Sequence, residues 1–280
     1  MARLLATDID DTLLARDGTL PPGNREALVR LHEAGIVIVF CSGRSDLSIR
    51  TVASRILDPA DDEYYIAFNG ARVVTADTRT DVAHRSVSPA ATARIVAYAR
   101  EHGLHLQGYI GDEFLVERAS PAADRYARDT GTDYRVVGDL AAALPDGSPK
   151  LLLIGDPDSL LSHRDALVSI GESLPDDHRY GTMFSKAHYL EIVAAGVNKG
   201  YALRRLAGIL GIPIEETIAV GDGENDAEML RAAGTGLAVA SAHPAARDAA
   251  DVVLDSAAEE AAIAEVAARF FEPLRPRRTS

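Results

Sequence analysis

Two acidic residues follow a strand-like segment near the start of this 280-residue chain. Asp8 and Asp10 come directly after a short apolar run that begins at residue 3. Two carboxylates that lie two residues apart on a turning segment can present one as a nucleophile and the other as a proton-transfer group. An acidic turn on a solvated surface is the alternative interpretation of this segment taken alone.

A second acidic segment, Gly-Asp-Gly-Glu-Asn-Asp over residues 221–226, also follows an apolar strand and opens a helix. Asp222 and Asp226 would join Asp8 and Asp10 at one edge of a sheet, where four carboxylates repel each other unless a hard cation binds them. Oxygen ligands of this kind suit Mg²⁺. Helix capping by Asp226 or its neighbour Asn225 is an alternative that does not exclude the metal site.

Two further segments could bind phosphate. Ser42 and Gly43 stand where a strand turns into a helix, a place that exposes backbone N–H groups and the N-terminus of the helix. Lys199 is one of only three lysines among 29 basic residues, and it stands at a predicted helix start, where the helix dipole disfavours a cation. A lysine at that place suggests a phosphate clamp or a charge-balancing ammonium.

These residues depend on an alternation of strands and helices at both ends of the chain. Such alternation predicts a doubly wound α/β sheet, in which ligands bind at the carboxyl ends of the strands. The predicted strands are residues 3–9, 36–41, 217–220 and 236–240, and the predicted helices are 24–34, 199–210 and 225–233.

The middle of the chain has a different pattern. Short strands pair as hairpins there, with residues 72–76 against 82–87 and residues 105–110 against 114–117, and a few helices lie between them. This pattern predicts an α+β insert. We therefore expect a discontinuous core made of residues 1–75 and 190–280, which carries one inserted domain at residues 76–189.

Composition narrows the functional class. Apolar residues make up 47% of the chain and charged residues 25%, as in folded globular proteins. The net charge of −13 has the wrong sign for a general nucleic-acid binder. The apolar runs are too short to span a bilayer, and the N-terminus lacks the pattern of a signal peptide. The single cysteine, Cys41, cannot form an internal disulfide, so we expect a cytoplasmic protein.

Taken in order, the motifs resemble those of the haloacid dehalogenase-like hydrolase superfamily. They are Asp-x-Asp-x-Thr at residues 8–12, Ser-Gly-Arg at 42–44, the lysine at 199, and Gly-Asp-x-x-Asn-Asp at 221–226. The long insert between the second and third motifs is similar to that of the Cof-type sugar phosphatases, which carry a large α/β cap. The resemblance implies a Rossmann-like doubly wound core with an inserted α+β cap domain.

The resemblance also implies an activity, that of a Mg²⁺-dependent phosphomonoester hydrolase. Asp8 would attack phosphorus and form an aspartyl-phosphate, and Asp10 would move protons to the leaving oxygen and from water. The implied ligands of Mg²⁺ are Asp8, Asp222 and the backbone carbonyl of Asp10, and Asp226 is either a further ligand or a residue that contacts the ligands. The implied phosphate-binding groups are the N–H groups of Ile9 and Gly43 and the side chains of Ser42, Lys199 and Asn225.

The cap of such a hydrolase would close over the sheet edge, exclude water and select the leaving group. The candidate substrate contacts are Arg44, Asn69, Lys186, His188 and Glu191. Two positions depart from the family pattern, because Asp11 stands where the family usually has Gly, and Ser241 where it often has Asn. Neither change removes an implied catalytic group.

The substrate implied by the resemblance is a small phosphorylated metabolite, with a sugar phosphate as the leading candidate. Phosphoglycolate, sucrose-phosphate and mannosyl-3-phosphoglycerate phosphatases are alternatives within the same fold, as is a phosphosugar mutase. A sensor that binds a phosphometabolite without turnover is the non-enzyme alternative. A sensor would have no need of a nucleophile and a proton donor beside a metal site.

Overall fold

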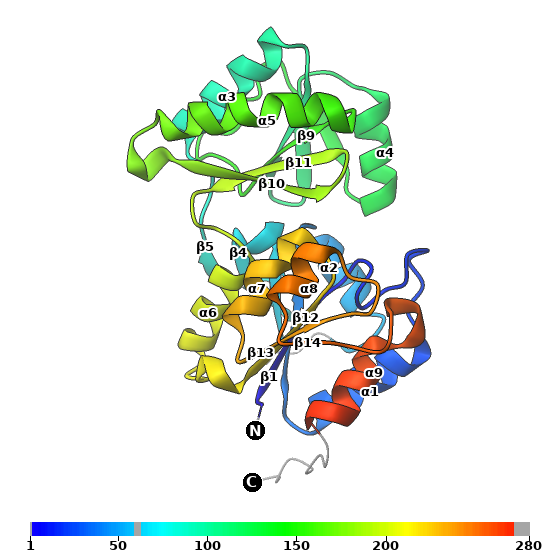
Figure 1. Cartoon of the computed structure of the whole chain (residues 1–280). Helices are drawn as coiled ribbons and strands as arrows, with labels where there is room; N and C mark the ends of the chain where they lie inside the picture. The colour runs from blue at the N-terminus through cyan, green and yellow to red at the C-terminus, as the bar shows by residue number, and fades with distance from the viewer. Residues whose placement is uncertain (1, 59–62, 272–280) are drawn as a thin grey trace. The chain divides into compact units, whose positions relative to one another are not determined.

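The computed structural model describes residues 2–58 and 63–271, and it divides the chain into two compact units, both drawn in Figure 1. The first unit comprises Met1–Ala83 and Asn198–Ser280, and the second comprises His84–Val197. The sequence-based boundaries at 75/76 and 189/190 fall before these two divisions. They differ because two strands after residue 71 extend the sheet of the first unit, and the strand that begins at Tyr189 belongs to the second.

An eight-stranded sheet forms the first unit, in the order β14-β13-β12-β1-β2-β3-β4-β5. Neighbouring strands from β14 to β3 are parallel, and β4 pairs antiparallel with β3. Strands β1, β2 and β12 are buried almost throughout, as expected where helices cover both faces of a parallel sheet. The strands are Leu4–Asp8 (β1), Val37–Cys41 (β2), Tyr64–Ala67 (β3), Arg72–Thr75 (β4), Asp81–His84 (β5), Thr217–Gly221 (β12), Thr235–Ala238 (β13) and Val252–Val253 (β14).

The helices of the first unit pack in two groups. Helix α7 contacts α6 and α8, while α1 packs against α9 (Figure 1). Their bounds are Pro22–Glu33 (α1), Asp46–Ala53 (α2), Lys199–Ile209 (α6), Ala227–Ala232 (α7), Pro244–Ala249 (α8) and Ala262–Val266 (α9). The predicted helix 225–233 is in fact a 3₁₀ turn, Glu224–Asp226, followed by α7.

A six-stranded sheet forms the second unit, in the order β10-β11-β9-β6-β7-β8. Its pairs are antiparallel except β7 with β8. The strands are His105–Ile110 (β6), Glu113–Val116 (β7), Tyr134–Val136 (β8), Leu151–Ile154 (β9), Tyr180–Lys186 (β10) and Tyr189–Ala194 (β11), and the helices are Pro89–Glu101 (α3), Pro121–Thr130 (α4) and Pro157–Glu172 (α5).

The two faces of this second sheet differ in character. One face carries an apolar core in which Ile95 of α3 and Leu167 of α5 lie with strand residues such as Leu153. Alternate strand residues point to the opposite face, where Tyr126 of α4 packs its ring against Tyr109 of β6. The second unit therefore has a hydrophobic core of its own.

The predicted fold class is confirmed, with a parallel α/β core and an α+β insert. The predicted assignment of the hairpin 72–76 with 82–87 to the insert is wrong, because β4 and β5 lie at the edge of the core sheet. The sequence did not predict helix α4. It buries only Ala123 and Tyr126 and is otherwise polar, so it has few apolar residues by which a helix can be recognised.

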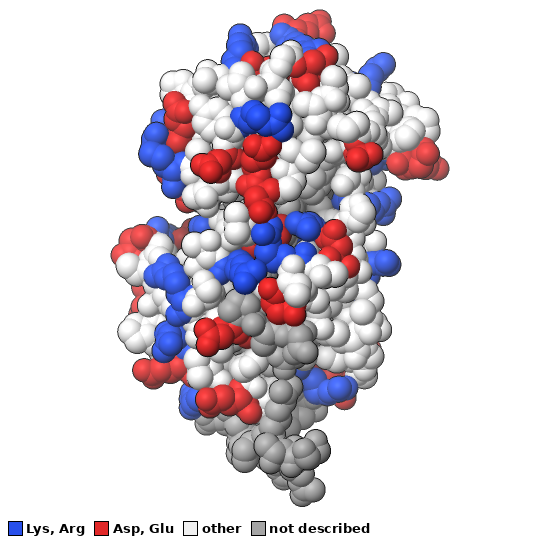
Figure 2. Space-filling model, turned by 180° about the vertical axis from the view of Figure 1, so that it is seen from behind, with Lys and Arg blue, Asp and Glu red and all other residues white. Residues whose placement is uncertain are grey.

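Charged side chains of the described residues form no patch of a single sign on the face shown in Figure 2. Acidic and basic side chains are interspersed there among uncharged ones. Within residues 2–58 and 63–271, no helix has both the length and the apolar character that crossing a membrane requires.

Candidate active site

The register of the core sheet brings the motifs to one edge. Asp8 ends β1 directly opposite Cys41 of β2, and Thr7 lies opposite Val220 of β12. Ser42 and Asp222 therefore follow the two strands that flank β1, at the same carboxyl edge as Asp8. This is the edge where a parallel sheet binds its ligands.

Lys199 lies between two buried carboxylates. Its ammonium donates a hydrogen bond to Oδ1 of Asp8 and another, of 2.6 Å, to Oδ1 of Asp226. All three residues are at least 95% buried. Helix α6 sets the position of the lysine, because the side chain of Asn198 caps the helix by accepting the N–H of Tyr201 at 2.7 Å.

Burial and the neighbouring carboxylates have opposite effects on the pKa of Lys199. Burial alone lowers the pKa of Lys199, but Asp226 and Asp8 outweigh that effect and raise it above its ordinary value. The lysine therefore stays charged at neutral pH. Burial, reinforced by Asp226, raises the pKa of Asp8 well above its usual range. Lys199 offsets only part of the negative charge.

Hydrogen bonds hold the side chains of Asp222 and Asp226 in place. Thr12 donates its hydroxyl to Oδ1 of Asp222 at 2.6 Å. Oδ2 of Asp226 accepts the backbone N–H groups of Asp222 at 3.1 Å and Gly223 at 2.9 Å. Burial, followed by the charge of Asp226, raises the pKa of Asp222 to about 7. A Cβ atom at Gly221 would lie 2.5 Å from Cβ of Asp226, so this close approach requires glycine.

Three of the carboxylates form a cluster with the chemistry of a divalent cation site. Oxygen atoms of Asp8, Asp222 and Asp226 lie within 4.8 Å of one another. Burial and then the repulsion from Asp226 raise the pKa values of Asp8 and Asp222, and a cation bound between these carboxylates would offset both effects. A hard cation with oxygen ligands, such as Mg²⁺, fits this donor set.

The side chain of Asp10 forms an ion pair with Arg44 and is not part of this carboxylate cluster. Nε and Nη2 of Arg44 donate to its two carboxylate oxygens at 2.9 and 2.6 Å, which makes a two-pronged ion pair. Arg44 was predicted from the sequence as a substrate contact. The structure places its guanidinium on the predicted proton-transfer group instead.

A strained turn supports the segment that contains Ser42 and Arg44. Phe68, Asn69 and Gly70 have φ values of 51°, 54° and 98°, the left-handed region that non-glycine residues avoid. The N–H of Phe68 donates to the carbonyl of Arg44 at 2.9 Å, and the N–H of Asn69 donates to the carbonyl of Ser42 at 3.0 Å. Backbone strain of this kind persists where the surroundings impose it, often at functional sites.

Asn69 also connects two of the motifs. Its side-chain oxygen accepts a hydrogen bond of 3.0 Å from the side chain of Asn225. Asn69 is fully buried. The predicted substrate contact therefore lies behind Asn225, the predicted phosphate ligand, and orients it.

Comparisons with known proteins agree with this arrangement. The model of the haloacid dehalogenase-like hydrolase family matches residues 5–266. The chain belongs to this family. Because the match takes in both units, it covers the core motifs together with the inserted cap.

Relatives of this hydrolase include two enzymes named HMP-PP phosphatase. The one from Citrobacter koseri is 31% identical over 245 residues, which cover 87% of this chain and 86% of the relative. The one from an Escherichia coli O157:H7 strain is 32% identical over 251 residues, covering 88% and 87%. With the family match, these relatives identify the hydrolase as a phosphatase of the Cof type that acts on a small phosphorylated metabolite.

Solved structures show the same fold. A haloacid dehalogenase-like hydrolase from Bacteroides thetaiotaomicron superposes with a TM-score of 0.86 at 26% identity, over 97% of this chain and all of the other. A protein from Thermotoga maritima superposes with a TM-score of 0.83 at 29% identity, over 96% of this chain and 97% of the other. The likeness extends over both units of the phosphatase.

The remaining predicted substrate contacts of the phosphatase belong to the second unit. Lys186 is exposed and His188 is half-buried. Glu191 is buried, and its carboxylate accepts hydrogen bonds from Lys150 at 3.1 Å and from Ser185 at 2.6 Å. Those contacts make Glu191 part of a buried ion pair inside the cap sheet.

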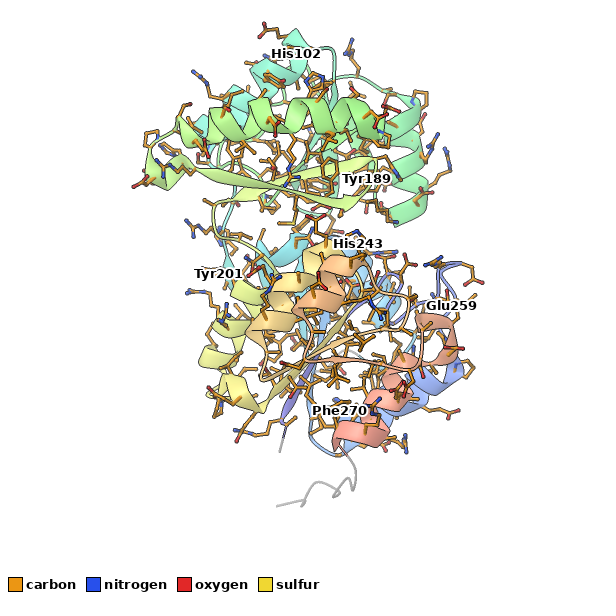
Figure 3. The ribbon with its side chains drawn as sticks, viewed as in Figure 1. His102, Tyr189, Tyr201, His243, Glu259 and Phe270 are labelled. Atoms are coloured by element: carbon orange, nitrogen blue, oxygen red, sulfur yellow. The ribbon has the colours of Figure 1, made fainter. Side chains whose placement is uncertain are left out.

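Two residues near the core site have roles that the sequence does not predict. Thr12 belongs to the first motif, and its hydroxyl orients Asp222. His243 caps the start of α8 (Figure 3), and its backbone N–H donates to the carbonyl of Asp222 at 2.8 Å. The spacing of residues in the sequence does not indicate His243, because its contact with Asp222 is made by backbone atoms and not by its side chain.

The structure also accounts for one departure from the family pattern. Asp11 has φ of 60°, which is a left-handed conformation that glycine adopts freely and that aspartate tolerates better than most residues. The turn that separates Asp10 from Thr12 therefore keeps its shape without glycine.

Proposed function

We propose that this phosphatase is a Mg²⁺-dependent phosphomonoester hydrolase that works through an aspartyl-phosphate at Asp8. The observation that carries the proposal is the buried cluster in which Asp8 contacts Lys199, with Asp222 and Asp226 within 4.8 Å. The cluster offers a nucleophile, a cation of the protein's own and oxygen ligands for a divalent metal at a single strand end.

In the first step, a carboxylate oxygen of Asp8 attacks the phosphorus atom and forms an O–P bond. The bond from phosphorus to the leaving oxygen breaks, and the electron pair goes to that oxygen. The carboxyl group of Asp10 then gives its proton to the leaving oxygen. Lys199 reduces the repulsion between the anionic nucleophile and the anionic phosphate.

In the second step, water attacks the phosphorus atom of the aspartyl-phosphate. Asp10 takes a proton from the water, and the bond between Asp8 and phosphorus breaks, which returns the electron pair to the Asp8 carboxylate. Inorganic phosphate leaves, and Asp10 is protonated for the next turnover. A covalent intermediate of this kind divides one difficult displacement into two easier ones.

The phosphoryl oxygens need donors that are fixed in advance. The side chains of Ser42, Lys199 and Asn225 and the N–H groups of Ile9 and Gly43 are the proposed donors. Asp8, Asp222, Asp226 and the carbonyl of Asp10 would hold Mg²⁺, which supplies charge stabilisation at the transferring phosphoryl group.

The leading substrate candidate is a sugar phosphate, because the insert is similar to that of the Cof-type sugar phosphatases. The relatives named HMP-PP phosphatase favour HMP-PP as a second candidate, since they are 31–32% identical over most of this chain. Both compounds belong to the class of small phosphorylated metabolites.

A release assay tests the proposal. Phosphate release would be measured for a panel of sugar phosphates and HMP-PP, with and without Mg²⁺, for the wild type and the variants Asp8→Asn and Asp222→Asn. We expect Mg²⁺-dependent release that both substitutions abolish. Tight binding of one compound with no release from any would instead favour the sensor.

A further inference from the structure

We propose that Arg44 is a positioning residue that holds the Asp10 carboxylate in place for activation of the hydrolytic water. This inference rests on the proposed function, in which Asp10 takes a proton from water in the second step. It assigns Arg44 a role that differs from the substrate contact expected from the sequence. The observation behind it is the two-pronged ion pair between Arg44 and Asp10.

The geometry of the pair fixes the carboxylate in orientation as well as in place. Nε and Nη2 are coplanar donors, and they engage one oxygen each, at 2.9 and 2.6 Å. A fork of this kind determines the plane of its partner, which a lysine ammonium does not. A carboxylate oxygen has two lone-pair sites, so one hydrogen bond from Arg44 to each oxygen does not by itself prevent Asp10 from taking a proton from water.

Arg44 is itself held on both its side chain and its backbone. Nη1 approaches Oγ of Ser48 at 3.4 Å, and the backbone N–H of Arg44 donates to Oγ of Ser42 at 3.2 Å. Its carbonyl accepts the N–H of Phe68, which lies in the left-handed region with φ of 51°. The strained turn therefore serves to fix the residue that orients Asp10.

Stability alone does not explain the pair. The side chains of Arg44 and Asp10 are 23% and 35% exposed, and ion pairs in contact with water contribute about 0–1 kcal/mol. Binding of substrate phosphate by Arg44 would compete with Asp10 for the same guanidinium. A fork that a strained backbone supports fits the positioning role better than either alternative.

The two steps of the reaction allow a clear test with 4-nitrophenyl phosphate. Its leaving group departs without a proton, so kcat/KM reports transfer to Asp8 and does not depend on Asp10 as an acid. For Arg44→Met we expect kcat to fall about tenfold or more. This loss is part of the ~10²–10⁴-fold rate acceleration that a correctly placed proton-transfer group contributes. KM should fall in parallel, kcat/KM should change less than threefold, and phosphoenzyme should accumulate.

Three further variants complete the test. Asp10→Asn should show the same fall in kcat with nearly unchanged kcat/KM. The double variant Asp10→Asn, Arg44→Met should show no further loss of kcat. Arg44→Lys, which keeps the charge without the fork, should fall between the wild type and Arg44→Met. Arg72→Met is the matched control, because Arg72 is also 23% exposed and pairs with Asp46 and Asp81. It should accumulate no phosphoenzyme.

Each other outcome contradicts the inference. A raised KM with unchanged kcat, together with weaker inhibition by inorganic phosphate, would make Arg44 a substrate ligand. Equal losses of kcat and kcat/KM in Arg44→Met and Arg44→Lys would show that the ion pair between Arg44 and Asp10 has only a structural role. If Arg44→Met matches the wild type, only this inference fails. If the wild type turns over neither the aryl phosphate nor any compound of the panel, the proposed function fails with it.

Discussion

Lys199 is the buried cation that balances charge at the site. Its ammonium pairs with the carboxylates of Asp8 and Asp226 and can neutralise only one of these two negative charges, and Asp222 adds a third carboxylate. Removing one partner from a buried ion pair costs about 3–5 kcal/mol, because the remaining charge stays uncompensated. The lysine therefore contributes both to folding and to the charge balance that a cation would complete.

Substitution of Lys199 by Met should destabilise the protein in a manner that Mg²⁺ partly reverses. We expect a loss of about 3 kcal/mol in the free energy of unfolding by urea without Mg²⁺, and a smaller loss with it. Lys150→Met is the matched control, because Lys150 is equally buried and pairs with Glu191 inside the cap unit. An equal response of both variants to Mg²⁺ would contradict the assignment of the cluster.

Asp222 should give the metal-free protein a recognisable pH dependence. Its pKa is raised from the ordinary 3.8 to about 7, so folding favours its protonated form. The contribution of this group to stability is present below pH 3.8 and is lost as the pH rises through 7. Without Mg²⁺, the stability of the wild type relative to Asp222→Asn should fall between pH 4 and 7. A difference that stays constant or rises over this range would contradict the raised pKa of Asp222.

At the scale of elements, strand ends and turns bring the motifs together. The alternation of strands and helices, and the site residues that follow β1, β2 and β12, could be predicted from the sequence, because apolar runs and the order of the motifs indicate them. The ion pair between Arg44 and Asp10 could not be predicted, because it depends on the direction of a side chain, which the spacing of residues does not indicate. The sequence-based prediction also misplaced β4 and β5, since a hairpin pattern does not tell which sheet a strand will join.

The turn at Phe68–Gly70 should be the most sensitive element near the site. A Cβ atom at Gly70 would lie 2.2 Å from the carbonyl oxygen of Asn198, the capping residue of α6. Gly70→Ala should therefore shift the helix start that presents Lys199, and lower both thermal stability and kcat. Gly18→Ala is the control, because Gly18 has φ of 78° with open space around it. It should cost about 1–2 kcal/mol and spare kcat. Equal effects of the two substitutions on kcat would refute this role of the turn.

At the scale of the molecule, the chain leaves the core unit after residue 83 and returns to it at residue 198. The second unit has a hydrophobic core of its own, built from α3, α5 and its sheet. A segment with a complete core and a single point of departure and return is expected to fold independently.

Residues 84–197, produced as a separate chain, should therefore unfold cooperatively in urea. Because the cluster of Asp8, Asp222 and Asp226 lies wholly in the core unit, Mg²⁺ should leave the unfolding midpoint of the separate cap unchanged. Circular dichroism during a urea titration, with and without Mg²⁺, would measure both properties. A non-cooperative transition would show that the cap depends on the core to fold.

The proposed mechanism carries the phosphoryl group through Asp8, so the residue that holds this group during turnover is the decisive observation. The wild type and Asp10→Asn would be quenched in acid during turnover of a Mg²⁺-dependent substrate, and the modified peptide identified by mass spectrometry. We predict a phosphoryl group on Asp8, at higher occupancy in Asp10→Asn. Phosphorylation of another residue, or steady turnover in both proteins without any phosphoenzyme, would contradict the proposed role of Asp8 as the nucleophile.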